Sequence, residues 1–308
     1  PRLAALRTAM AEAEVNAFLV PRADKFQGEY VAPCDDRLAW LTGFTGSAGF
    51  AAITQDIAGV FVDGRYRLQV RAQVADDFTP VNWPEVKLGP WLAEHLGDGA
   101  VVGFDPWLHT TDEIEAIRKA IGARITLRPI TNLVDRIWDD RPAPPSAPAR
   151  AHPIEFAGEK SGEKRERMAK LLRKAGQKAA VITLPDSICW MLNIRGSDIP
   201  RNPVVHAFAM IHDTARVSLF SDPAKFAPLG PDPAIDVADW DAFEGALDAL
   251  DGPVRVARKT APVAGGDILK EAGVELVWDD DPCILPKACK NDAELQGMRD
   301  AHMTDAVA

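Results

Sequence analysis

The chain has 308 residues, of which 47% are hydrophobic and 26% are charged. Its length predicts two folded domains, and its composition excludes disorder over most of the chain. The formal net charge of −10 argues against a nucleic-acid partner, and the apolar runs are too short to predict a membrane-spanning helix.

The first half of the chain alternates between helical and strand patterns. An amphipathic helix leads into a buried strand that stops at Pro21, and two strands of alternating polarity follow. The predicted series is a helix at 2–14, strands at 17–21, 49–53 and 59–63, a helix at 85–96, a strand at 101–104, a helix at 112–122 and a strand at 124–127. Hairpins followed by strand-helix-strand units are typical of a mixed sheet covered by helices.

A proline-rich segment at 141–153 separates the two halves of the chain. Its prolines have no N–H groups for a helix or a central strand, so the segment predicts a stiff, extended linker. They are Pro142, Pro144, Pro145, Pro148 and Pro153.

The second half repeats the first. In both halves a helix leads into a strand that stops at a proline, and an aspartate then precedes a tryptophan by four residues, as in Asp36 with Trp40 and Asp186 with Trp190. The predicted series is a helix at 163–175, strands at 179–184, 207–211 and 217–220, a helix at 238–250, a strand at 254–257, a helix at 266–272 and a strand at 275–278. We therefore expect an α/β fold made of two tandem copies of one domain.

The last residues, 291–308, predict an amphipathic helix with Asn291 or Asp292 as its N-cap. An isolated helix of this length is marginal in water, so its apolar face needs a partner. We expect a third domain to begin here; the alternative is a helix that packs back on the second domain.

The four cysteines, Cys34, Cys189, Cys283 and Cys289, have no zinc-ligand spacing. They are interpreted as buried thiols in a reducing compartment. The charged N-terminal segment does not resemble a secretory signal, so we expect a cytoplasmic protein.

No metal site is predicted within these residues. The acidic run 279–281 is interpreted as a solvated loop, and His206 and His212 have a spacing that does not suit one helix face. His302 lies on the apolar side of the final helical pattern, where a core or interface histidine is expected.

The glycine-rich stretch 43–49 matches neither a nucleophile elbow nor a phosphate-binding loop. Two interpretations stay open: a tight strand connection, or a surface that displays Phe44, Thr45 and Ser47 toward a cleft. Asp63 is expected to pair with one arginine across these loops, and the remaining guanidinium could receive a substrate carboxylate.

Several long motifs resemble those of the three-domain X-prolyl aminopeptidases, in the creatinase-like superfamily of metallopeptidases. They are Asp-x-Arg-x-x-Trp-Leu-Thr-Gly-Phe-Thr-Gly-Ser-Ala-Gly at 35–49, Asp-Gly-Arg-Tyr at 63–66, the stretch 190–204 and the terminal segment 290–306. The resemblance covers essentially the whole chain.

This resemblance implies a creatinase N-terminal-like domain at 1–140, the linker at 141–153, a second such domain at 154–289, and the first helix of a pita-bread catalytic domain at 290–308. It implies hydrolysis of peptides with proline at the second position. Two Asp, one His and two Glu of the catalytic domain would hold two metal ions, usually manganese. None of these ligands and no catalytic residue falls within 1–308, so this chain alone is expected to be inactive.

The resemblance also implies a homodimer and an N-terminal domain that helps close the active-site cleft. The candidates for that contact are Arg37, Phe44, Thr45, Ser47 and Arg65. The stretch 190–204 could instead support the second domain against the third. A catalytically inactive binding module with an acidic surface for basic partners stays open as the alternative. A creatinase-type amidinohydrolase is less favoured, because such enzymes normally have one N-terminal domain.

Overall fold

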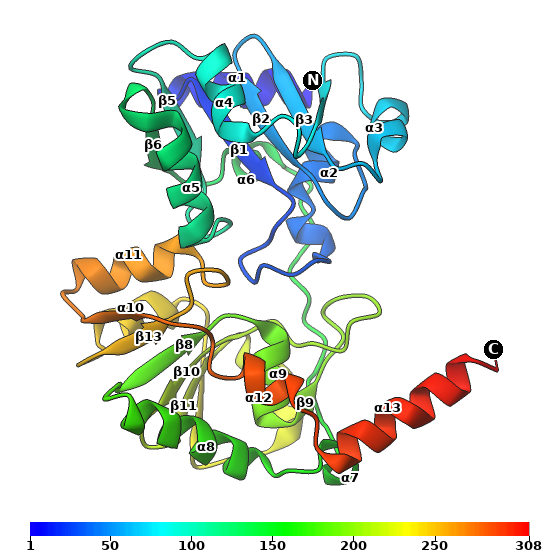
Figure 1. Cartoon of the computed structure of the whole chain (residues 1–308), viewed down its shortest axis with the longest axis vertical. Helices are drawn as coiled ribbons and strands as arrows, with labels where there is room; N and C mark the ends of the chain where they lie inside the picture. Colours follow the sequence, from blue (N-terminus) through cyan, green and yellow to red (C-terminus); the bar gives the residue numbers. More distant parts are fainter. Residues whose placement is uncertain (308) are drawn as a thin grey trace. The chain divides into compact units, whose positions relative to one another are not determined.

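The chain divides into two compact units, Pro1–Pro144 and Pro145–Ala308. The computed structural model describes residues 1–307, and each unit has its own sheet (Figure 1). The division falls inside the predicted linker. No helix within the described residues is both long enough and apolar enough to cross a membrane.

The sheet of unit 1 has six strands in the order β4-β3-β2-β1-β5-β6. Strand β2 is antiparallel to both β1 and β3, whereas the other neighbouring pairs are parallel. The strands are β1 (Ala17–Pro21), β2 (Phe50–Thr54), β3 (Ala58–Val62), β4 (Thr79–Asn82), β5 (Val101–Phe104) and β6 (Thr126–Pro129).

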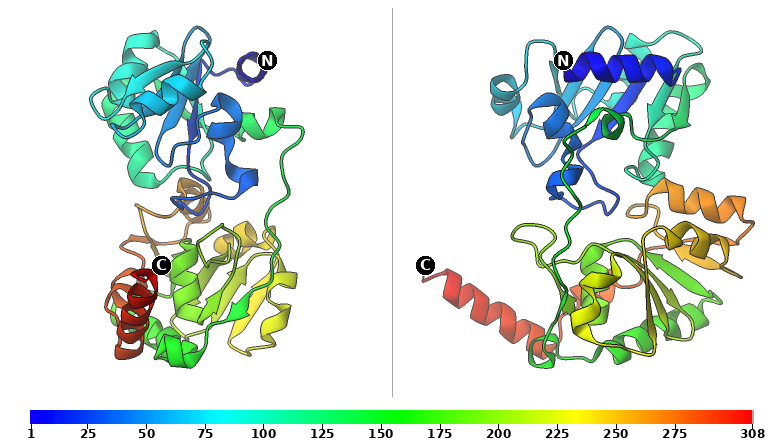
Figure 2. Two further views of the ribbon diagram at one scale, coloured as in Figure 1. Left: turned by 90° about the vertical axis from the view of Figure 1, so that its right-hand side faces the viewer. Right: turned by 180° about the vertical axis from the view of Figure 1, so that it is seen from behind.

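Helices cover both faces of this sheet (Figure 2). Phe18 and Val20 of β1 join the apolar cluster of unit 1, where they pack with Leu6 and Met10 of the N-terminal helix. The helices are α1 (Arg2–Glu12), α2 (Arg37–Thr42), α3 (Arg67–Gln73), α4 (Leu88–His95), α5 (Thr111–Ile121) and α6 (Leu133–Ile137), with short 3-10 turns η1 (Pro33–Asp35) and η2 (Gly122–Arg124). All five residues of β3 are buried, as expected for a strand covered on both faces.

Unit 2 has the same topology. Its strands lie in the order β12-β11-β10-β8-β13-β14, and each neighbouring pair runs in the same relative direction as its counterpart in unit 1. They are β8 (Ala179–Ile182), β10 (Phe208–His212), β11 (Val217–Phe220), β12 (Ile235–Ala238), β13 (Val254–Val256) and β14 (Leu276–Trp278); β7 (Arg150–Ala151) and β9 (Ile194–Arg195) form a separate ribbon. The predicted α/β duplication is confirmed.

The helices of unit 2 include the counterpart of α2, since the segment with Asp186 and Trp190 forms α9 just as that with Asp36 and Trp40 forms α2. They are α7 (Ile154–Ala157), α8 (Ser161–Lys174), α9 (Pro185–Leu192), α10 (Ala242–Asp248), α11 (Val263–Glu271), α12 (Ile284–Ala288) and α13 (Asp292–Asp305), with 3-10 turns η3 (Pro223–Lys225) and η4 (Ala227–Leu229).

The predicted linker is irregular up to Ala149, where it joins unit 2. The Ala149 amide donates to the carbonyl of Lys225 at 2.8 Å, and the next two residues form β7. The second half of the proline-rich segment is therefore part of unit 2 rather than a free connection.

The terminal helix α13 is confirmed, with the Asn291 side chain accepting from the Glu294 amide at 2.9 Å. Asn291 also donates to the carbonyl of Ala157, which attaches the start of α13 to α7. Leu295, Met298 and Met303 stay 38%, 47% and 68% exposed, so the helix does not pack its apolar side back on unit 2. His302 is exposed as well, so it does not occupy a core position in unit 2.

Two expectations about single residues are wrong. Cys289 is exposed, because it follows the short surface helix α12, whereas Cys34, Cys189 and Cys283 are buried as predicted. Asp281 is only 5% exposed, because its carboxylate turns inward to accept the Cys283 amide at 2.8 Å. The acidic run is therefore not a uniformly solvated loop.

Candidate functional site

Most of the predicted site residues lie at one edge of the unit 1 sheet. The loop 43–49 connects α2 to the start of β2, and Asp63 to Tyr66 follow the end of β3. Because β2 runs antiparallel to β3, these two segments meet at the same edge. The hydroxyl groups of Ser47 and Tyr66 share a hydrogen bond of 2.7 Å across them.

Phe44 does not lie on the surface of this loop. Its side chain is 1% exposed, belongs to the apolar cluster of unit 1, and meets the Tyr66 ring edge-on at a centroid distance of 5.6 Å. A Cβ atom added at Gly46 would lie 2.2 Å from the Phe44 ring, so that position excludes any side chain. Phe44 thus anchors the loop. Glycine is required at position 46 because the Phe44 ring packs directly against its backbone.

Thr45 is exposed and is fixed by α3. Its amide donates to Gln73 Oε1 at 3.0 Å, and Gln73 Nε2 donates to its hydroxyl at 2.8 Å. Gly43, which ends α2 with φ of +82°, sits against the Gln73 carbonyl, where a Cβ would approach to 2.9 Å. The loop is therefore held at both its first turn and its tip.

Asp63 does pair with an arginine, and the partner is Arg65, two residues away in the same turn rather than across the loops. Its Nη2 lies 2.8 Å from Asp63 Oδ2, and its side chain is 63% exposed. The pairing lowers the pKa of Asp63, chiefly through the hydrogen bond from Arg65. Arg65 keeps an exposed guanidinium face beside Tyr66.

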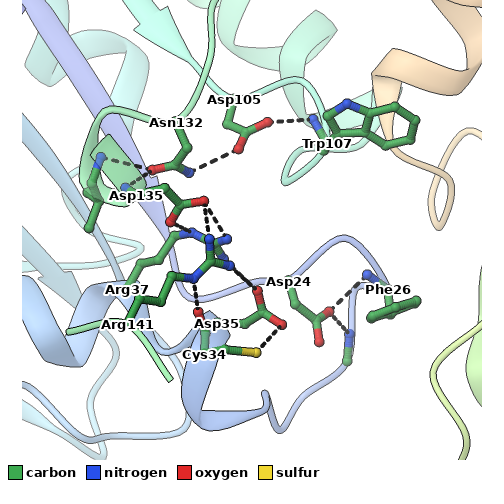
Figure 3. A network of polar contacts seen from close by, with 12 residues as sticks. Asp24, Phe26, Cys34, Asp35, Arg37, Asp105, Trp107, Asn132, Asp135 and Arg141 are labelled. Atoms are coloured by element: carbon green, nitrogen blue, oxygen red, sulfur yellow. Dashed lines mark hydrogen bonds and ion pairs between the residues drawn. The ribbon is translucent and has the colours of Figure 1, made fainter. Parts of the chain in front are cut away.

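Arg37 lies in the interior, not at this surface. Its side chain is 5% exposed and binds Asp135 through Nε at 2.6 Å and Nη2 at 2.9 Å, and Asp35 through Nη1 at 2.9 Å (Figure 3). Burial by itself would lower the pKa of Arg37, but the two carboxylates outweigh burial and raise it. Arg37 therefore joins η1, α2 and α6, and its guanidinium is occupied by carboxylates of its own unit.

A larger polar network surrounds this pair. Arg141 reaches Asp135 at 2.8 Å and donates to the carbonyl of Cys34 at 2.6 Å. Asn132 caps α6 through its side-chain oxygen and donates to Asp105 at 3.0 Å (Figure 3). The residues come from segments about a hundred positions apart, and the network fixes the turn before α2 against α6.

Asp24 belongs to the same region. Its Oδ1 accepts the amides of Phe26 at 2.9 Å and Gly28 at 3.3 Å, which closes the turn after β1. Burial, followed by the charge of Asp35, raises the pKa of Asp24 to about 7.

A cavity of about 510 Å³ opens at the same edge. Ser47 and Gly49 of the predicted loop line it together with Trp83, His109 and Glu113. The last three residues belong to segments that carried no recognisable motif. These three residues lie beside the loop because the strands that precede them, β4 and β5, belong to the same sheet as β2.

The stretch 190–204 of unit 2 has its own buried ion pair. Lys225 binds the carboxylate of Asp198, and their side chains are 3% and 0% exposed. Asp198 also accepts the amide of His206 at 2.6 Å. These contacts tie the stretch to η3 within unit 2.

Metal-binding groups are not assembled in the part of the chain that is described. Within residues 1–307, no three His, Cys, Asp or Glu side chains are grouped so that they could hold a metal ion.

Two parts of the sequence match the same protein family. Residues 2–137 and residues 140–294 each match the creatinase/prolidase N-terminal domain. The paired matches agree with the duplicated topology of the two sheets.

Longer relatives match over the whole chain. The chain is 36% identical to a probable Xaa-Pro aminopeptidase P of Ajellomyces dermatitidis, over 100% of the chain and 53% of the relative. It is 30% identical to aminopeptidase P2 of Arabidopsis thaliana, over 96% of the chain and 47% of that protein. The chain thus spans about half the length of the curated relatives it matches.

A solved structure shares the fold of both units. The X-prolyl aminopeptidase of Caenorhabditis elegans, described as a cytosolic enzyme with a di-nuclear active site, aligns with a TM-score of 0.89 and 28% identity. The alignment covers 98% of this chain and 53% of that protein.

Proposed function

The chain belongs to the creatinase/prolidase N-terminal domain family, and we propose that it forms the N-terminal portion of an Xaa-Pro aminopeptidase. The observation that carries the proposal is the 36% identity that extends over 100% of the chain but only 53% of the relative. In this proposal the complete enzyme removes the residue that precedes a proline at the N-terminus of a peptide.

The hydrolytic centre belongs to a further domain in this proposal. We propose two manganese ions there, a homodimer and a cytoplasmic location. The description of the C. elegans relative as a cytosolic enzyme with a di-nuclear active site supports two metal ions and the location. When bound, such ions would activate a hydroxide and polarise the scissile carbonyl.

The test compares the complete gene product with residues 1–308. The complete protein should release the first residue of Xaa-Pro peptides when Mn²⁺ is added, whereas residues 1–308 should leave the same peptides intact. Metal analysis and sedimentation of the complete protein test the two ions and the dimer. A complete protein that binds peptides without cleaving them would overturn the proposal in favour of the binding module.

The exposed edge of unit 1 is proposed to contact peptides in the cleft. Thr45, Ser47 and Arg65 lie there, while Arg37 and Phe44 hold the segments that carry them. In the complete enzyme, Thr45→Ala and Arg65→Met should lower kcat/KM for long peptides more than for tripeptides. Leu68→Ala, which removes an 85% exposed side chain of α3, is the matched surface control.

A further inference from the structure

A cavity of about 520 Å³ lies in unit 2, beside the start of the terminal helix. Its walls come from α7, α9, β9, α12 and α13 (Figure 1). The stretch 190–204 contributes Trp190, Arg195 and Val204 to the lining. The cavity belongs to unit 2, whereas the residues proposed above to contact peptides belong to unit 1.

One edge of the Arg195 guanidinium in this lining has no partner. Its Nη1 donates to the carbonyl groups of Ile194 at 2.8 Å and Cys189 at 3.3 Å, which holds the group in place. Its Nε and Nη2 form no hydrogen bond or ion pair with any of residues 1–307. Both nitrogens keep solvent-accessible surface, since Arg195 contributes no buried, unpaired nitrogen to the described residues. Two parallel N–H donors on one edge match the two oxygens of a carboxylate.

A second arginine strengthens the need for an anion beside Arg195. Arg150 lies directly opposite Arg195 in the antiparallel ribbon of β7 and β9. Directly opposed residues of such a pair have side chains on the same face, and like charges there repel each other. Neither arginine has a carboxylate partner among residues 1–307. A bound carboxylate would therefore reduce this repulsion as well as pair with Arg195.

The carboxylates of the lining are already occupied by other groups. Asp186 forms an ion pair with Lys287. Glu294 accepts the indole N–H of Trp190 at 3.2 Å through one oxygen and the amide of Asn291 at 3.0 Å through the other. Neither carboxylate is therefore left to neutralise the arginine.

The cavity carries a positive charge, although the chain has a net charge of −10. Its lining contains Arg195, Lys287 and Lys290, against the two carboxylates. His152 also lines the cavity, and burial, followed by the charge of Arg195, lowers its pKa, so it is uncharged at pH 7. A local excess of cations attracts an anionic ligand.

Much of the remaining lining is apolar. Phe156 of α7 is 56% exposed, Met298 of α13 is 47% exposed, and both line the cavity together with Pro203 and Val204. An apolar group of a ligand that covered these side chains would remove apolar surface from water on both molecules. The lining thus fits a ligand that carries an apolar group next to a carboxylate.

We propose that this cavity binds the C-terminal end of a peptide, with the terminal carboxylate on Nε and Nη2 of Arg195 and an apolar last side chain against Phe156 and Met298. A free amino acid fits less well, because the cations of the lining repel its ammonium group. That the ligand is a peptide rests on the proposed function. The free guanidinium edge, the positive charge and the apolar lining do not depend on it.

The test measures binding to residues 1–308 without any hydrolysis. The probe is N-acetyl-L-phenylalanine, titrated by saturation-transfer NMR, with an expected Kd on the order of 1 mM for a molecule of this size. N-acetyl-L-phenylalanine amide, which lacks the negative charge, should bind at least about fivefold more weakly. N-acetylglycine, which lacks the apolar side chain, and free L-phenylalanine, which carries the ammonium group, should also bind more weakly.

Four variants locate the binding. Gly297→Trp should abolish it, because Gly297 lines the cavity and has open space where a side chain would begin. Gly245→Trp is the matched control, since Gly245 is an exposed glycine of α10 with similar open space but lies outside the cavity, and it should change nothing. Arg195→Met should reduce the affinity for the acid to that for the amide. Phe156→Ala should weaken binding of the acid about threefold.

Absence of binding to the unaltered chain would overturn the proposal, and so would equal affinity for the acid and the amide or unchanged binding by Gly297→Trp. Circular dichroism shows whether a variant is folded, and Gly297→Trp still tests the site if Arg195→Met fails to fold.

The complete protein separates a peptide from a carboxylate of the remaining chain. If Gly297→Trp left the affinity of the complete protein for the acid unchanged, the remaining chain would fill the cavity and the proposal would fail. Failure of the proposed function has a different signature: the cavity would bind the acid in preference to the amide while the complete protein left Xaa-Pro peptides intact.

Discussion

Asp135 holds Arg37 across 98 residues of sequence, with Nε to Oδ1 at 2.6 Å and Nη2 to Oδ2 at 2.9 Å. Two parallel hydrogen bonds of this kind match the planar fork of a guanidinium to a carboxylate. Because Arg37 begins α2 and Asp135 lies in α6, the pair fixes the helix that leads into the loop 43–49.

The first prediction concerns this pair. Asp135→Ala leaves the buried Arg37 paired with Asp35. Because removal of one partner from a buried ion pair is costly, the free energy of unfolding should fall by about 3 kcal/mol or more. Urea unfolding followed by the fluorescence of the stacked Trp40 and Trp138 should show this loss in unit 1. Asp63→Ala, at the exposed pair with Arg65, is the control and should leave the transition unchanged.

The second prediction concerns Lys225 and Asp198. Lys225→Met leaves a carboxylate that is fully buried and should destabilise unit 2 by about 3 to 5 kcal/mol. The double variant Lys225→Met with Asp198→Leu removes both charges and should be more stable than Lys225→Met alone. Urea unfolding of the two single variants and the double variant measures the coupling. If the loss of stability in the double variant equalled the sum of the losses in the two single variants, the two residues would not be coupled as an ion pair.

The third prediction is a pH dependence caused by Asp281. Burial raises the pKa of Asp281 in the folded state, and the Cys283 amide only partly offsets this. The folded state then retains a proton that the unfolded state releases, so this group stabilises the fold at low pH and loses that effect as pH rises through the raised pKa. Asp281→Asn should therefore gain Tm relative to the unaltered chain at pH 7 more than at pH 4. Equal differences at both pH values would rule out this origin.

The fourth prediction concerns the position of the loop tip. Gln73→Ala removes the acceptor of the Thr45 amide, so that amide should exchange with solvent at least about tenfold faster. Gln69→Ala is the matched control, because Gln69 donates to the Thr45 hydroxyl and to the Gln73 side chain but not to the Thr45 backbone. Hydrogen exchange measured by NMR separates the two. If both variants accelerated exchange of the Thr45 amide equally, its protection would come from α3 as a whole rather than from the Gln73 hydrogen bond.

Much of the fold could be predicted because the apolar pattern is strong in its central strands. The bounds predicted for the strands at 17–21, 101–104 and 217–220 agree with β1, β5 and β11. The edge strands β4 and β12 were missed. They contain mostly exposed or half-buried residues, so their sequences lack the apolar alternation by which a strand is recognised.

The candidate site was predicted only in part. The sequence pointed to the loop 43–49 through its glycines, and the structure gives Phe44 and Arg37 an interior position there. Whether a side chain near a short loop is buried depends on the elements that pack against it, and those elements lie far away in the sequence. His109, Glu113 and Trp83 had no local signal, because a pocket residue needs no particular neighbour in the sequence.

The amino-acid sequence by itself determined that the chain is a duplicated α/β protein, because repeated apolar periods and proline positions are local properties of the chain. The tertiary structure decided which charged groups are buried and paired, as with Arg37 and Asp135, because the sheet joins segments that are distant in the sequence. It also decided that Trp83 and His109, which are 26 residues apart, line one cavity, since the sheet brings their segments together.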